Sequence, residues 1–228
     1  MAAKRVTRKQ LLKEPDEFIS LTGRVVAWVK AHPKQLAIGA GVFVGLLVMV
    51  TGYRYIDERR AQAASRLLSQ GISTFQQRLE SGDKSEALEA VRSDFDKLIN
   101  DFSGQPAGHL GLVYYGQILL GAGKYEEAVK MLQRAWTDLG NDPALANIIL
   151  ESLAEAFLQA GDKTAAITQF EKLVSGGGTL YKDAAMFQLG VLYFESDQAE
   201  KGKAMLTRLT ETFPASRYAE MAREKIAG

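Results

Sequence analysis

The sequence predicts an all-α protein in which one membrane-spanning helix near the N-terminus is followed by an α-solenoid, a row of stacked helix pairs. Two observations carry this expectation. An uncharged apolar run covers residues 36–53, and a pattern of large and small residues recurs three times between Leu110 and Pro214. With 228 residues, the chain has room for one soluble domain of ordinary size beyond the apolar run.

The apolar run has the length of a membrane span. Its eighteen residues, at about 1.5 Å each, extend roughly 27 Å, close to the thickness of a bilayer's hydrocarbon core. Lys34 precedes the run, Arg54 follows it, and aromatic residues that favour the headgroup region lie nearby (Trp28, Tyr53 and Tyr55). A core helix this short is rarely apolar on every side, so we expect a transmembrane helix over 35–56.

Charge predicts the orientation of this span. Residues 1–34 carry a net charge of +5, whereas residues 54–228 carry −4. A short basic tail crosses a membrane unfavourably, while a long C-terminal domain crosses largely regardless of charge, so we expect the tail inside and the domain outside. Ala61-Gln62-Ala63 mimics a signal-peptide cleavage site, but it lies well past the apolar run and the basic tail is longer than a signal's. We therefore expect the span to stay as an anchor.

The basic tail, 1–34, contains a second expected helix over 15–31. Pro15-Asp16-Glu17 is typical of a helix start, and apolar residues then recur at helical spacing: Phe18, Leu21, Val25, Trp28 and Val29. Such a helix could lie on the inner membrane surface or dock on a partner, and the residues leave both open. His32-Pro33 marks the expected break before the span.

Inside the span, three small residues fall on one helix face: Ala37, Gly41 and Gly45. Because small residues let helix backbones approach closely in a membrane, this row predicts a helix-packing face.

Three segments of the C-terminal part align on one scheme of large and small residues. The first comprises Leu112, Tyr115, Gly116, Leu119, Gly123, Tyr125, Ala128, Leu132 and Ala135; the second comprises Leu150, Leu153, Ala154, Phe157, Gly161, Ala166, Phe170 and Leu173; the third comprises Met186, Leu189, Gly190, Tyr193, Gly202, Leu206, Leu209 and Pro214. A pair such as Tyr115-Gly116 lets a second helix cross closely over the first, and a turn glycine suits a left-handed helix end. Each segment therefore predicts one helix pair.

This scheme resembles the tetratricopeptide repeat. It departs from the family pattern because no segment begins with tryptophan, because Leu173 and Leu209 replace the usual alanine, and because the connections 136–144 and 175–181 are long. The resemblance implies three tetratricopeptide-type repeats over 107–214 and a function in binding proteins, without naming a partner. Residues 57–106 are expected to form leading helices of a degenerate repeat, and residues 215–228 a capping helix over the last apolar face.

The whole layout is similar to YfgM-like proteins of bacterial inner membranes. The local match is the run from Lys34 to Tyr55, followed by Ala61, Ala63 and Ala64. This resemblance implies a periplasmic repeat domain and a translocon-associated or chaperone-like role, with the Sec translocon, envelope chaperones or exported clients as partners and with membrane lipid around the span. The rival function is a cytosol-facing membrane scaffold for division or assembly machinery with the same fold.

The sequence contains no motif that carries chemistry. His32 and His109 are its two histidines, it has no cysteine, and Gly176-Gly177-Gly178 lacks the Lys-Ser/Thr signature of a phosphate loop. We therefore expect no catalytic residue, no metal, no cofactor, no small-molecule substrate and no nucleic acid. A binding scaffold, and not an enzyme, is the expected function.

First helices of stacked repeats conventionally line a concave groove, so their residues are the expected partner-binding face. Carried onto this sequence, that face comprises Leu110, Val113, Gln117, Leu120, Ile148, Glu151, Glu155, Leu158, Ala184, Phe187, Val191 and Phe194. Phe187 and Phe194 are the expected apolar anchors for an amphipathic segment. The sequence leaves open whether a partner or the domain's own leading or terminal helix fills this groove, and whether the two rings pack on the cap instead.

Overall fold

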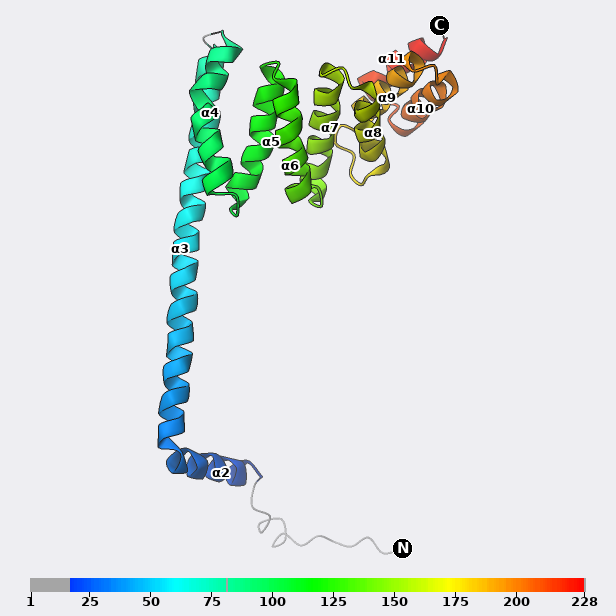
Figure 1. Ribbon diagram of the computed structural model, residues 1–228. Helices are drawn as coiled ribbons and strands as arrows, with labels where there is room; N and C mark the ends of the chain where they lie inside the picture. Colours follow the sequence, from blue (N-terminus) through cyan, green and yellow to red (C-terminus); the bar gives the residue numbers. More distant parts are fainter. Residues whose placement is uncertain (1–16, 81, 228) are drawn as a thin grey trace, which may run out of the picture. The chain divides into compact units, whose positions relative to one another are not determined.

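The structure, a computed structural model, describes residues 17–80 and 82–227, and every regular element in that part of the chain is a helix (Figure 1). The helices run over Glu17–Ala31 (α2), Pro33–Glu80 (α3), Lys84–Asp101 (α4), Pro106–Gly121 (α5), Tyr125–Leu139 (α6), Pro143–Gln159 (α7), Lys163–Ser175 (α8), Lys182–Glu195 (α9), Ala199–Thr212 (α10) and Arg217–Ala227 (α11). The all-α expectation is confirmed. The basic tail up to residue 14, the start of its helix at 15 and 16, and the side chains of Phe18 and Leu21 lie outside the described residues.

Two compact units divide the chain, Met1–Glu58 and Arg59–Gly228. In the first unit, the helical backbone is interrupted at His32, between α2 and α3, where the sequence predicts a break. Pro33 has no N–H to donate and opens the next helix, α3. Backbone hydrogen bonds of 3.1 Å lead from His32 N to Trp28 O and from Leu36 N to His32 O.

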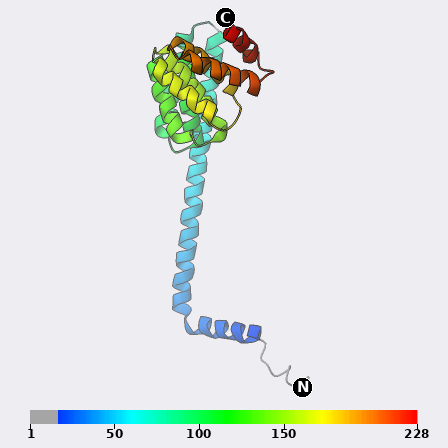
Figure 2. The same cartoon turned by 90° about the vertical axis from the view of Figure 1, so that its right-hand side faces the viewer.

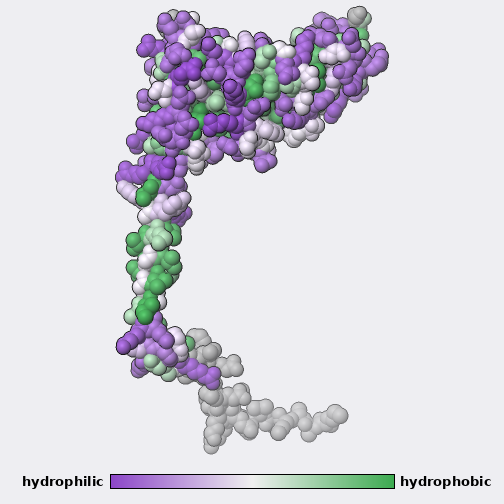
Figure 3. All heavy atoms as spheres, viewed as in Figure 1, coloured by the Kyte–Doolittle hydropathy of each residue, from purple (hydrophilic) through white to green (hydrophobic). Residues whose placement is uncertain are grey.

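The N-terminal part of α3 is the apolar run. Its most apolar window of eighteen residues has a mean hydropathy of 2.1 and no buried residue. Figure 3 shows a largely hydrophobic band along the visible side of this stretch. In the described part of the chain, α3 is the one helix long and apolar enough to cross a membrane, which makes it compatible with a membrane anchor.

The second unit is a row of helix pairs, seen from two sides in Figures 1 and 2. Helices α5 and α6, α7 and α8, and α9 and α10 form the three pairs that the repeats predict, and α11 packs on α9 and α10 as a cap. Each second helix also packs on the next first helix, α4 on α5, α6 on α7 and α8 on α9. The C-terminal part of α3 packs on α4, and these two helices form the leading pair. The side chains of Leu68, Leu88 and Phe95 lie in the core between them.

Each of the three repeats turns between its helices through one left-handed residue. The expected glycines hold this position in the first two, Gly123 with φ 77° and Gly161 with φ 85°. In the third repeat Asp197 occupies it with φ 58°, a conformation in which aspartate is among the more tolerant residues. The same bond closes all three helix ends, for example from Lys124 N to Leu119 O at 2.9 Å.

Small residues lie where paired helices cross, as the scheme predicts. A Cβ added to Gly116 would come within 2.6 Å of Leu132 Cγ, and one added to Gly190 within 2.5 Å of Leu206 Cδ2. A Cβ on Gly202 would meet Phe194 at 2.8 Å, and Ala166 is fully buried. Packing at these crossings therefore leaves no room for a larger side chain.

The buried side chains form two clusters that meet at α7. One face of α7 contributes Ile149 and Leu153 to the cluster that extends back to α3, and the other contributes Leu150 and Ala154 to the cluster that extends to α11. Because one helix serves both clusters, the repeats form a continuous solenoid.

Candidate protein-interaction site

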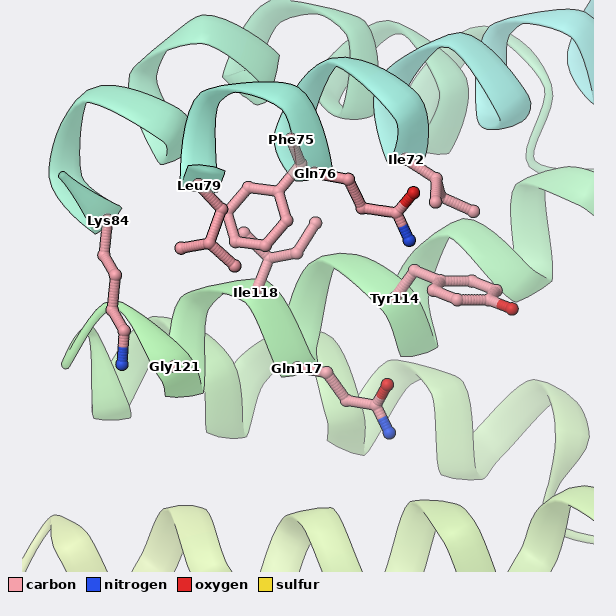
Figure 4. A pocket seen from close by; sticks show the side chains of 9 residues that line it. All are labelled: Ile72, Phe75, Gln76, Leu79, Lys84, Tyr114, Gln117, Ile118 and Gly121. Carbon is pink, nitrogen blue, oxygen red and sulfur yellow. The ribbon is translucent and has the colours of Figure 1, made fainter. Parts of the chain in front are cut away.

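An open groove of about 400 Å³ lies between α3 and α5, the first helices of two consecutive pairs (Figure 4). Helix α3 contributes Ile72, Phe75, Gln76 and Leu79; α5 contributes Tyr114, Gln117, Ile118 and Gly121; and Lys84 lies at the start of α4. The groove belongs wholly to the second unit.

The walls of the groove are mainly apolar and partly open to solvent. Leu79 keeps 38% and Tyr114 42% of its surface exposed, although both are large. Behind them, Ile72 and Phe75 are half-buried and Ile118 is 7% exposed, so these side chains are anchored in the first core cluster. Such a combination of a fixed apolar floor and exposed large side chains is typical of surfaces that bind other proteins.

Polar groups at the groove can orient a bound partner segment. In Figure 4, Gln76 and Gln117 flank the apolar floor, and the ammonium of Lys84 lies at the end near Gly121. Gln117 also donates from Nε2 to Ser152 Oγ on α7 at 3.1 Å. This bond joins the groove to the first helix of the next pair.

On α7 the first-helix face is acidic. Glu151 and Glu155 are half-buried and one turn apart, and Gln159 Nε2 donates to Glu155 Oε1 at 2.7 Å. Burial, together with the neighbouring charge of Glu155, raises the pKa of Glu151 above its ordinary value. Among the described residues, no Lys or Arg forms an ion pair with either carboxylate, so a cationic group of a partner would be favourable here.

The residues expected to line the binding face differ in how accessible they are. Gln117 lines the groove, and Leu110, Leu120 and Ile148 are half-buried against the first core cluster. Val113 is only 5% exposed, because it belongs to that cluster. A direct contact between Val113 and a partner is therefore not available in this conformation.

In the second and third pairs, the expected apolar residues support the core. Leu158 packs on the second cluster, and Ala184 and Val191 are half-buried. The ring of Phe187 lies 5.6 Å from that of Tyr218 on the cap, and Phe194 lies against Gly202 in the crossing of α9 and α10. Phe187 therefore packs on the cap, and Phe194 packs within its own helix pair. The role of these two residues as partner anchors stays a prediction.

The α3 wall of the groove was not predicted from the sequence. Its signal is present, because Leu68, Ile72, Phe75 and Leu79 recur every three or four residues. The scheme of the three repeats begins only at Leu110, however, and a degenerate leading pair gives no register from which groove positions can be assigned.

Other polar features of the second unit serve packing. Tyr193 donates its hydroxyl to Glu171 Oε1 at 2.5 Å and, with Lys201 and Arg208, lines a shallow pocket of about 290 Å³. Burial raises the pKa of Tyr115 and of Tyr193 to about 12, so both phenols are neutral. In the described part of the chain, no group of three His, Asp or Glu residues could hold a metal ion.

Stacked helix pairs with an open first-helix groove define a protein-interaction scaffold, a class whose fold is typically non-catalytic. The chain belongs to the family of tetratricopeptide repeat-like domains, whose sequence profile matches residues 26–177, more than half of its length. A tetratricopeptide repeat profile also matches residues 184–216. No curated protein matches the chain significantly.

Solved structures show the same fold at low sequence identity. A tetratricopeptide repeat protein from Parabacteroides merdae is 18% identical with a TM-score of 0.56, over 69% of this chain and 58% of its own. A putative kinesin light chain from Podosopora anserina with TPR-like repeats is 16% identical with a TM-score of 0.60, over 72% and 84%. MamA from Desulfovibrio magneticus is 18% identical with a TM-score of 0.51, over 68% and 77%. The chain thus spans less than two thirds of the Parabacteroides protein.

Proposed function

We propose that this chain is a membrane-anchored protein-interaction scaffold of the bacterial cell envelope. Its span would lie in the inner membrane, its basic tail in the cytoplasm and its repeat domain in the periplasm, in the translocon-associated or chaperone-like role that the YfgM-like resemblance implies. The observation that supports binding most directly is the open apolar groove between α3 and α5. The unburied apolar band of α3 supports the anchor.

The proposed partner segment lies in the groove with an apolar face toward Phe75, Leu79 and Tyr114. A segment long enough to pass Gln117 reaches the acidic face of α7, where Glu151 and Glu155 favour a basic side chain. Recognition therefore combines an apolar anchor with a charge at a set distance along the segment, as in other helix-in-groove complexes.

The row of Ala37, Gly41 and Gly45 is proposed to pack on a membrane helix of the same assembly. A Cβ added to Gly41 or Gly45 would meet nothing within 4 Å, so both positions are open to a neighbouring helix.

Topology is tested by reporters fused after Gly228. Alkaline phosphatase folds only outside the cytoplasm, so its activity in this fusion supports the exported domain. Fluorescence of a cytosol-specific reporter at the same position, with no phosphatase activity, contradicts the proposal and favours the cytosol-facing scaffold.

Binding through the groove is tested by photo-crosslinking from position 76 in living cells. Tyr114→Ala is expected to remove most of the crosslink to a translocon subunit, because a truncated interface anchor typically costs about 2 kcal/mol or more. Tyr181→Ala is the matched control, since Tyr181 is equally exposed at 42% but lies in the loop before α9, outside the groove. Equal crosslinking by both variants would show that the groove is not the binding site.

A further inference from the structure

Helix α2 presents large apolar side chains that nothing in the described structure covers. Val25, Val26, Trp28 and Val29 are 41–59% exposed, although they form the greater part of the last two turns of the helix. At 3.6 residues per turn, these four residues fall on one side of α2. The opposite side of the same turns carries the small residues Gly23, Ala27 and Ala31, so the large apolar side chains are confined to one side, and residues 23–31 include no acidic residue.

The two cations of this part of α2 lie at the edges of its apolar side. Arg24 precedes Trp28 by four residues, and Lys30 follows Val26 by four, which makes each a neighbour of one edge. Long basic side chains at the borders of an apolar face can extend to phosphate groups while their stems stay on apolar surface. Binding to a protein partner would not require a cation at each border of the apolar side.

Chain connectivity keeps α2 close to the start of the apolar run. His32 is the one residue between α2 and α3, and Leu36 opens the apolar run. Five steps from Ala31 to Leu36 cover at most about 18 Å even when fully extended. Helix α2 has 15 residues, fewer than the roughly 20 that a membrane-spanning helix needs, so it cannot cross the bilayer itself.

At the junction between the two helices, Trp28 contacts His32. The imidazole of His32 stacks on the Trp28 ring with centroids 5.0 Å apart and an interplanar angle of 27°. His32 Nδ1 lies 3.0 Å from Trp28 O, which adds a second contact at the helix end. Tryptophan at the edge of a span favours the headgroup region, and here its ring stacks on His32 beside the break.

We propose that α2 is an in-plane membrane helix that binds the anionic surface of the leaflet from which the span begins. Val25, Val26, Trp28 and Val29 enter the boundary between headgroups and acyl chains, while Arg24 and Lys30 bind lipid phosphates. This inference rests on the membrane anchor of the proposed function, but it adds a second contact with lipid that depends on the charge of the leaflet.

The full chain in vesicles tests the inference through the fluorescence of Trp28. The sequence has two tryptophans, so Trp136→Phe leaves Trp28 as the sole reporter. In vesicles of phosphatidylcholine mixed with phosphatidylglycerol, we expect blue-shifted emission and the strongest quenching by acyl chains brominated near the headgroup. Arg24→Glu with Lys30→Glu is expected to reduce this quenching at least twofold, and removing phosphatidylglycerol should act likewise.

Lys203→Glu with Lys225→Glu is the matched control, because it reverses two exposed cations of the repeat domain and should leave quenching unchanged. Carbonate extraction of the same vesicles reports separately whether the span is inserted. If the chain is inserted but Trp28 is not quenched, or is quenched only by deeply placed bromine, the inference is overturned while the anchor stands. Quenching that is equal in neutral vesicles overturns the recognition of anionic lipid, and a chain that carbonate removes overturns the anchor.

Discussion

Two stretches of the same helix, α3, differ in what surrounds them. Residues 36–53 are apolar on every side and all exposed, whereas the stretch 64–80 is apolar along one stripe, which buries Ala64, Leu68 and Gly71 against α4 and α5. Both are regular α-helix, so backbone conformation does not separate them. The difference teaches that the period of the apolar residues, rather than their number, decides whether a helix packs on its own chain.

Glycines sharpen the contrast between the two stretches. A Cβ added to Gly45 would meet nothing within 4 Å, while one added to Gly71 would lie 3.1 Å from the ring of Phe95. Small residues in the first stretch therefore leave space for molecules outside the chain, and those in the second fit a neighbouring helix of the same chain.

The largest expected effect comes from removing a ring that fills the core beside α3. Phe95 is 1% exposed and stacks on Tyr115 with ring centroids 5.2 Å apart. Phe95→Ala should lower the free energy of unfolding of the repeat domain by about 3–5 kcal/mol, through lost burial and a cavity. Urea denaturation in detergent, followed by circular dichroism, measures this. Phe43→Ala is the control, because Phe43 is 63% exposed, and it should leave the free energy of unfolding unchanged. An equal loss of stability in both variants would contradict the contrast between the two stretches.

A charge placed in the apolar run should act on membrane insertion alone. Leu46→Arg is expected to disfavour insertion by about 3 kcal/mol, because arginine is costly at the centre of a span. The fraction of chain that resists carbonate extraction should fall, while the melting temperature of the repeat domain stays constant. Ser69→Arg, on the exposed side of the second stretch, should alter neither quantity. Unchanged extraction of Leu46→Arg would argue against a membrane span.

At a helix crossing, one added methyl group should already lower the stability of the repeat domain. Gly190→Ala brings a Cβ to 2.5 Å from Leu206, so the pair must separate at a cost of about 1–3 kcal/mol. Ala166→Leu, at the corresponding crossing of the preceding pair, should cost a similar amount. Gly45→Ala is the control from the span. Thermal unfolding that is the same for all three variants would show that the repeat register is wrong.

The smallest expected effect is that of pH on the acidic face of α7. Because burial raises the pKa of Glu151, its ionised form costs native stability at pH 7, and this cost disappears as pH falls below the ordinary carboxyl pKa of 4.5. Glu151→Gln should therefore stabilise the domain at pH 7 and lose this advantage at pH 4. Glu211→Gln, on an exposed part of α10, serves as the control in the same denaturation series. An advantage that is independent of pH would exclude the buried carboxylate as its cause.

Much of the fold follows from patterns that are local in the sequence. The large-small pairs, such as Tyr115-Gly116, and the turn glycines predicted the three helix pairs, and His32-Pro33 predicted the break before α3. Asp197 was not predicted to be left-handed, because aspartate adopts this conformation only when the surrounding turn requires it. The expected binding face includes Val113, which is buried, and does not include the α3 wall of the groove.

The sequence by itself determined which stretches are helical, where they turn and which of their faces are apolar, because spacing, caps and breaks act over a few residues. Only the tertiary structure decided which apolar side chains stay open. Tyr114 faces a groove because α3, some forty residues earlier, leaves it uncovered, while Phe187 is covered because Tyr218 of the cap lies against it. Exposure depends on distances between residues far apart in the chain, and no local pattern contains those distances.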